Sequence, residues 1–373
     1  MYHRNPIAVS HHRGAATARD GAVSVFAAVV TVVWLALYTP FAHSIDEARY
    51  VDVGIVVFDP GIPADASTHS KLGIFPEIRK AEAKYMPVIL RRTLIDSGEW
   101  GVVRVLPEAL DSSELLVTGT IEHSDGQRLD LRIVARDASG ALWLDRLYTG
   151  TTTSAGYPVK IDSDPYIDVY QRIASDLLEV RRQMSDKQLA DLRQIALMRY
   201  AIALAPEVFA SYLGSTPQGT YTLLRLPAED DPMLARVVRI RNQEYLFIDT
   251  VDEQYAQLAE AMAPTYNLWR QYSAEQAEYR DEYEARVSGR SSQGRRGSFI
   301  ALEQTYNAYK WSKIHQQDLD ELALGFNNEV APTVMEVSGT VFKLSGGLDA
   351  QYTEWREILR RIFALETGLP PAA

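Results

Sequence analysis

The stretch Glu114–Tyr148, ELLVTGTIEHSDGQRLDLRIVARDASGALWLDRLY, decides the fold of the first half of the chain. Its central residues, 129–136, alternate apolar and polar side chains, which is the period of a strand with one buried face. Asp125-Gly126 and Ser139-Gly140 are turn pairs, because glycine accepts a positive φ without a Cβ clash. The stretch therefore predicts a meander of three successive strands joined by two short turns.

The residues around this meander predict the rest of a sheet and its covering helices. Residues 51–58 are a continuous β-branched run, typical of a strand buried on both faces. A helical pattern follows over 74–98, in which Pro87 is expected to kink the helix or divide it in two. Residues 100–106 predict a second strand, and apolar spacing over 166–178 predicts a closing helix. The first part of the chain is therefore predicted to be α+β, a mixed sheet with packed helices.

The bulk composition limits the classes of partner and chemistry. The chain has 373 residues, which is enough for two ordinary domains, and its formal net charge is −11. Such an acidic balance argues against nucleic acid as a main partner. The chain contains no cysteine, which excludes disulfides, thiolate catalysis and cysteine-bound metals.

The first 44 residues have the layout of a targeting segment. Residues 1–20 carry several arginines, residues 21–38 are uncharged and largely apolar, and small residues follow. This order predicts a cleaved signal peptide, with a retained membrane anchor as the alternative because the apolar run is about as long as a minimal membrane span. Both place the rest of the chain outside the cytoplasm, either periplasmic or secreted, or anchored in the inner membrane by residues 21–38.

The order strand, helix, strand, meander and helix over residues 47–184 resembles the N-terminal, non-propeller domain of periplasmic TolB. Related domains occur in CsgG and in LpoB-type activators of penicillin-binding proteins. The motifs that carry the resemblance are Gly54–Phe58 (GIVVF), Leu94–Trp100 (LIDSGEW), Val117–Ile121 (VTGTI), Ser124–Gly126 (SDG) and Asp137–Gly140 (DASG). The resemblance implies a non-enzymatic module of the bacterial cell envelope that binds another protein.

Residues 185–373 predict a mainly α-helical domain. Ser185 or Asp186 is expected to cap a helix that ends at Gly214, and residues 216–231 predict a loop or a short hairpin. A helix of more than fifty residues follows over 232–287, marked by a near-heptad apolar stripe.

Arg241 and Asp252 interrupt that stripe. A Gly/Ser/Arg-rich stretch at 288–298 predicts a flexible loop, and helical spacing resumes over 299–366. Within it, residues 333–344 have the β-branched content of a strand but the spacing of a helix, and we expect a helix. Two long periodic segments around one flexible loop predict a long antiparallel helical hairpin.

No motif predicts a catalytic residue, a bound cofactor or a metal ion. His69, His123 and His315 lack partner histidines at metal-binding spacing, and we expect them to be solvated or to cap local structure. The acidic run 229–231 precedes the long helix, where negative charge offsets the helix dipole. A weak divalent-cation site of oxygen ligands is the alternative there.

The candidate partner-binding residues are Arg290, Arg295 and Arg296, in the predicted loop. They are expected to contact an acidic protein or a membrane surface, and a plain soluble linker is the alternative. The chain is therefore expected to be an envelope adaptor or assembly factor that acts by protein–protein interaction without catalysis. Two alternatives stay open. One is an envelope hydrolase or transferase with a carboxylate site between the domains, and the other is a structural coiled-coil protein that self-assembles through its helices.

Overall fold

A computed structural model describes residues 49–69, 74–110, 112–160, 163–288, 333–337 and 339–369. By its contacts the chain divides into Met1–Arg49 and Tyr50–Ala373, and the description concerns the second unit. The predicted signal peptide or anchor lies outside the described residues, as does the predicted helical segment 299–332. Among the described helices, none combines the length and apolar character needed to cross a membrane.

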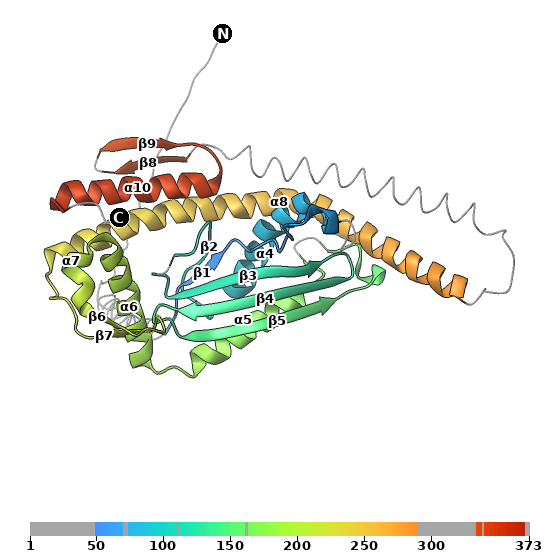
Figure 1. The fold of residues 1–373 in the computed structure, drawn as a ribbon, viewed down its shortest axis with the longest axis horizontal. Coiled ribbons are helices and arrows are strands. Elements are labelled where there is room, and N and C mark those ends of the chain that lie inside the picture. The colour runs from blue at the N-terminus through green and yellow to red at the C-terminus, as the bar shows by residue number, and fades with distance from the viewer. Residues whose placement is uncertain are drawn as a thin grey trace, which may run out of the picture. The chain divides into compact units, whose positions relative to one another are not determined.

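The first part of the described chain is a five-stranded mixed sheet in the order β2-β1-β3-β4-β5 (Figure 1). β1 pairs in parallel with both β2 and β3, and β3, β4 and β5 form an antiparallel meander. The predicted meander and the strand–helix–strand opening are therefore confirmed. The elements of this first part are β1 (Val53–Val56), η1 (Ala66–Thr68), α4 (Pro76–Asp96), β2 (Val103–Leu106), β3 (Leu115–Ser124), β4 (Arg128–Asp137), β5 (Leu142–Thr151), η2 (Ser154–Gly156) and α5 (Ile167–Arg182).

Two helices cover one face of this sheet. α4 packs on β1, β2 and β3, and α5 packs on β5, so the alternating apolar residues of the strands are buried between sheet and helices. Figure 1 shows α4 and α5 on the same side of the sheet. Pro87 lies inside α4, which stays one helix. Of the two expected outcomes, a kink or a division, the division does not occur, because the residues on both sides of Pro87 are buried in the core and hold the helix together.

The second part of the described chain is mainly helical, with two small hairpins. Its elements are α6 (Asp186–Leu204), α7 (Pro206–Phe209), η3 (Ala210–Tyr212), β6 (Leu213–Ser215), β7 (Tyr221–Leu223), α8 (Pro232–Ser288), β8 (Thr333–Val337), β9 (Thr340–Leu344) and α10 (Leu348–Thr367). The predicted cap at Ser185 is confirmed as a capping box with Gln188. The helix ends ten residues before Gly214, because Pro206 interrupts it, and Gly214 lies in strand β6.

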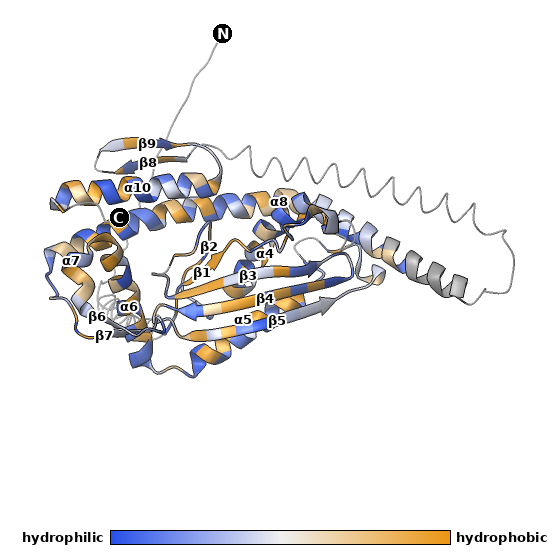
Figure 2. Ribbon diagram, viewed as in Figure 1, coloured by the Kyte–Doolittle hydropathy of each residue, from blue (hydrophilic) through white to orange (hydrophobic). Residues whose placement is uncertain are grey.

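The 57-residue helix α8 confirms the predicted long helix. Its N-terminal half lies against α10 in antiparallel direction, since Arg239 pairs with Glu366 while Tyr255 contacts Asp349. The predicted antiparallel packing of long helices is thus seen between α8 and α10. Figure 2 shows hydrophobic and hydrophilic residues interleaved along both helices, as expected for helices buried on one side.

Residues 333–344 form the β8–β9 hairpin, so the helix expected there was wrong. Val337 pairs with Thr340, and Gly339 in the turn has a φ of 76°. The hairpin buries alternate residues against the helices, and Phe342 packs edge-on against Trp355 of α10. Helical spacing and β-branched content conflicted in this stretch, and a glycine suited to a tight turn favoured the strands.

Candidate functional site: the junction of α8 and the sheet

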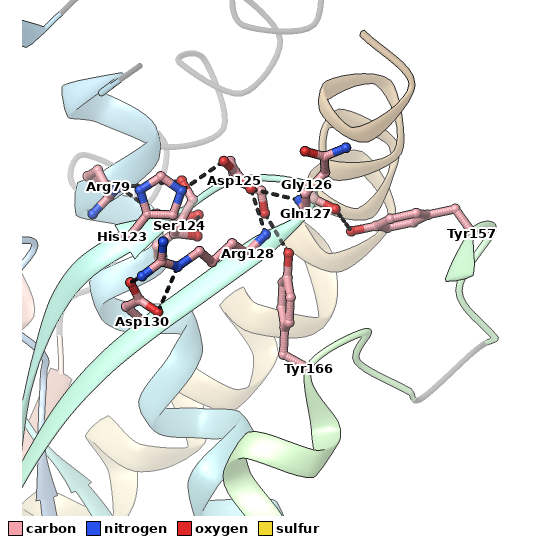
Figure 3. Close-up of polar contacts among 11 residues, drawn as sticks. Arg79, His123, Ser124, Asp125, Gly126, Gln127, Arg128, Asp130, Tyr157 and Tyr166 are labelled. Atoms are coloured by element: carbon pink, nitrogen blue, oxygen red, sulfur yellow. Dashed lines mark hydrogen bonds and ion pairs between the residues drawn. The ribbon is translucent and has the colours of Figure 1, made fainter. Parts of the chain in front are cut away.

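The turn between β3 and β4 is where the long helix meets the end of the sheet. Asp125 organises the turn: its Oδ1 accepts hydrogen bonds from the backbone amides of Gln127 and Arg128, each at 2.7 Å, and its Oδ2 lies 2.8 Å from Nε2 of His123 (Figure 3). Burial alone would raise the pKa of Asp125, but these hydrogen bonds hold it below its usual value. His123 thus contacts the side chain that organises the turn.

The backbone of the turn is pressed against α8. A Cβ on Gly126 would lie 2.0 Å from the carbonyl oxygen of Arg270, so only glycine fits at this distance. Two tyrosine hydroxyls hold the turn from the other side: Tyr157 donates to the carbonyl of Gly126 at 3.0 Å, and Tyr166 donates to the carbonyl of Asp125 at 2.8 Å (Figure 3). The turn is thus fixed both to α8 and to the segment that leads into α5.

Beneath the turn lies a buried ion pair between α8 and the start of α5. Arg270 is 0% exposed, and its Nη1 lies 2.7 Å from Oδ2 of Asp164, whose side chain is 1% exposed. The guanidinium group lies 3.9 Å from the ring centre of Tyr266 and 5.3 Å from that of Tyr166. These ring faces replace part of the hydration that the cation loses on burial.

A second buried carboxyl, Glu82 of α4, completes the network. It accepts hydrogen bonds from the hydroxyls of Ser124 at 2.6 Å and Tyr266 at 2.5 Å, and it lies 3.3 Å from Nε of Arg79. Burial raises the pKa of Glu82, and the neighbouring Arg79 opposes that rise. Through this one side chain, α4, β3 and α8 are joined to one another.

Further toward the N-terminus of α8, the helix covers the open edge of the sheet at β2. Oδ1 of Asp252 accepts a hydrogen bond from the backbone amide of Val105 at 2.8 Å, and Oδ2 lies 2.6 Å from Arg91 of α4. Arg104 of β2 pairs with Asp249 at 2.5 Å. An unpaired strand edge invites association with other strands. Because the carboxylate of Asp252 accepts from an edge amide, it protects β2 from such pairing.

A cleft of about 590 Å³ opens beside the buried ion pair, between α4, α8 and the segment that precedes α5. Its apolar wall includes Ile89, Ile167 and Pro264, and its carboxylates are Asp96, Asp164 and Glu260. Asp164 is held by Arg270, and Glu260 lies 3.7 Å from Arg92. No group of three or more His, Asp or Glu side chains within the described ranges is placed to hold a metal ion. Asp164 and Glu260 are thus each paired with an arginine.

The predicted site residues have different outcomes. Arg290, Arg295, Arg296 and His315 lie outside the described residues, so the loop contact stays a prediction. His69 lies 2.7 Å from the carbonyl oxygen of Pro63. Asp231, in the acidic run, accepts from the amides of Met233 and Leu234 and caps α8, as expected from the dipole argument.

Sequence reasoning missed Arg270, Asp164 and Glu82 as a group. The sequence did hold a signal for the neighbouring contact of α8 with β2: Asp252 interrupts the apolar stripe of α8 and is 5% exposed. A polar residue within a buried stripe indicates a partner on another element.

Comparison with known proteins adds little to this geometry. No family model matches the chain, and no curated protein matches it. Among solved structures, a dodecamer of a PelC variant from Paraburkholderia phytofirmans matches over 36% of this chain and 90% of that chain, with 20% sequence identity and a TM-score of 0.22. A likeness at that score carries no argument about function. These findings include no member of the TolB or CsgG families, so that resemblance stays a prediction.

Proposed function

We propose that the chain is a non-enzymatic docking module of the bacterial cell envelope, which binds another exported protein through the edge strand β5 and the adjoining sheet face. The observation that carries the proposal is that β5 is the outer strand of the sheet, with a helix-free face beside it, among the described elements. The N-terminal apolar segment supports an exported location.

The exposed side of β5 has the character of a protein-binding surface. In the strand register, Leu142 lies beside Arg136 and Leu147 beside Arg132, on the face opposite the helices. The two leucines are 51% and 42% exposed. Large apolar side chains on an open strand edge favour addition of a strand from a partner, in which main-chain hydrogen bonds give affinity and side chains give specificity.

The strand is held firmly from its other side. Asp176 of α5 accepts a hydrogen bond from the hydroxyl of Tyr148 at 2.7 Å and pairs with Arg146 at 2.8 Å. A docking edge that is already ordered loses little conformational entropy when a partner binds.

The junction described above supports the adaptor role. Asp252 contacts β2 and Glu278 contacts η2, and these two residues of α8 span about 40 Å of helix at 1.5 Å per residue. α8 continues to Ser288, and Figure 1 shows this end passing beyond the sheet. A partner bound at β5 and a second contact at the far end of α8 would therefore be held at a fixed separation.

The test compares the full chain, tagged and expressed at native level, with two variants. Leu147→Asp places a charge on the proposed surface, and Gln171→Asp places one on an exposed position of α5 as the matched control. We expect one exported protein to co-purify with the wild type and with Gln171→Asp, and to be lost with Leu147→Asp.

Two outcomes contradict the proposal. Equal recovery of the same proteins from both variants removes β5 as the docking surface. If only a second copy of this chain is recovered, and Leu147→Asp abolishes that recovery, then β5 is an edge for self-association and the adaptor role is contradicted.

A further inference from the structure

A second cleft, of about 410 Å³, lies away from the junction of α8 and the sheet. It is formed by α6, β7, α8, α10 and the segment before β3. Its lining is part apolar and part polar, and Leu110, Ile202, Leu204 and Leu359 belong to the apolar part. A concave cleft that combines apolar walls with converging polar groups is the usual form of a small-molecule site.

The polar groups of this cleft are mainly cationic. Arg199, Arg356 and Arg360 line it, and Glu244 is the one carboxylate among its described lining residues. Such a concentration of guanidinium groups contrasts with the acidic balance of the whole chain, whose formal charge is −11.

Glu244 is already saturated by contacts within the protein. Its Oε2 accepts from the hydroxyl of Tyr200 at 2.6 Å, and its Oε1 accepts from that of Tyr352 at 2.7 Å and lies 3.4 Å from Nε of Arg356. The carboxylate is 3% exposed. It therefore presents little negative charge to a ligand, and its role is to hold Tyr200 and Arg356 at the cleft wall.

Arg360 is the cation left for a ligand. It is half-buried on α10 and forms no hydrogen bond or ion pair with any residue that the structure describes. Across the cleft, the guanidinium of Arg199 lies 4.5 Å from the ring centre of Tyr221, which fixes its orientation. A half-buried cation with no counter-ion among the described residues favours an anion as its partner.

We propose that this cleft binds a small molecule that carries a carboxylate or phosphate next to an apolar portion, with Arg360 as the principal anion contact. Guanidinium groups match both oxyanions in geometry, because their N–H groups form a planar fork. The apolar walls would take the rest of the ligand. This site is independent of partner docking at β5.

The test measures binding to the purified full chain with three probes: inorganic phosphate, phenyl phosphate and benzoate. Sodium chloride at matched ionic strength corrects for general salt effects. Titration calorimetry gives Kd, and the ligand-induced rise in Tm gives an independent readout. We expect phenyl phosphate or benzoate to bind saturably with Kd below about 1 mM, and the stronger of the two identifies the preferred oxyanion. Inorganic phosphate alone is expected to bind more weakly than phenyl phosphate.

Two adjacent arginines on α10 provide a matched pair of variants. Arg360→Gln is expected to weaken binding at least ten-fold, while Arg361→Gln, whose 71% exposed side chain pairs with Glu357, leaves Kd unchanged. Ala203→Trp fills the cleft from its rim without changing charge and is expected to abolish binding. The proposal is overturned if neither aromatic probe binds the wild type in this range, or if Arg360→Gln and Arg361→Gln bind equally well.

Discussion

Arg270 and Arg360 lie on different helices near tyrosine side chains, yet their surroundings are opposite. Arg270 is fully buried, forms an ion pair with Asp164 and lies against the ring of Tyr266. Arg360 is half-buried in a cleft and has no partner among the described side chains. The difference separates a charge that holds two parts of the fold together from a charge that is available to a ligand.

The same contrast applies to the two edges of the sheet. At β2, the backbone amide of Val105 donates to Asp252 of α8, and the edge is covered. At β5, no described strand pairs with the outer edge, where Arg172 of α5 donates to the carbonyl oxygen of Thr149 at 2.5 Å, and Leu142 and Leu147 are exposed on the adjoining face. A fold that protects one edge with a buried carboxylate and leaves the other without a paired strand favours the second edge as the place for a partner.

The largest expected effect comes from breaking the buried ion pair. Asp164→Ala leaves the cation of Arg270 buried without its counter-ion, and we expect the free energy of unfolding to fall by about 3–5 kcal/mol. Urea unfolding of the full chain measures this loss. Glu357→Ala, which removes an exposed pair with Arg361, is the control and should change stability by less than about 1 kcal/mol. A loss at Asp164 as small as that of the control would contradict the structural role assigned to Arg270.

The burial of the Glu114 carboxyl is less well compensated by hydrogen bonds and ion pairs than that of Asp164, so its contribution to stability depends on pH. Burial raises the pKa of Glu114 from 4.5 to about 7, although its Oε2 accepts from the amide of Asp52 at 3.0 Å and lies 4.0 Å from Arg193. Because the pKa in the folded state exceeds the unfolded value, the folded state binds the proton more tightly. The stability contributed by the protonated form is complete below pH 4.5 and is lost as the pH rises through 7.

Glu114→Gln cannot ionise and should remove this loss. We expect the variant to match the wild type near pH 4.5 and to exceed its unfolding free energy by up to about 3 kcal/mol above pH 7. Urea unfolding at a series of pH values measures the difference between the two proteins, in which other titrating groups cancel. A difference that stays constant from pH 4.5 to 8 would show that Glu114 does not titrate in this range.

The smallest of the three effects is steric. Gly126→Ala places a methyl group 2.0 Å from the carbonyl oxygen of Arg270 and should push the β3–β4 turn away from α8, at a cost of about 1–3 kcal/mol. Gly347→Ala is the matched control, since its Cβ would meet nothing within 4 Å. Hydrogen exchange of the 124–128 amides localises the change. Equal stability of the two variants would mean that the turn is not pressed against the helix.

The sequence alone was sufficient to predict the elements whose apolar residues follow one clear period. The meander of β3, β4 and β5, the helix α8 and the helix α10 follow directly from alternation or helical spacing. Residues 333–344 were predicted wrongly because two signals conflict there, and the hairpin depends on packing of Phe342 against Trp355. The local sequence pattern carries no information about that contact between distant residues.

The buried network was beyond sequence reasoning for a different reason. Arg270 and Asp164 are 106 residues apart in the chain, and Tyr266 and Glu82 are 184 apart. Each residue alone looks like an ordinary charged or aromatic residue of a helix or loop, and only the fold brings them together. The cleft at Arg360 depends likewise on α6, α8 and α10 meeting.

The most direct measurement of the docking claim is site-specific photo-crosslinking in cells that produce the full chain. A photoreactive side chain at position 147 of β5 is compared with the same side chain at position 171 of α5. The account predicts a discrete adduct between this chain and a different exported protein from position 147, and none from position 171. No adduct from position 147, or the same adducts from both positions, would contradict it.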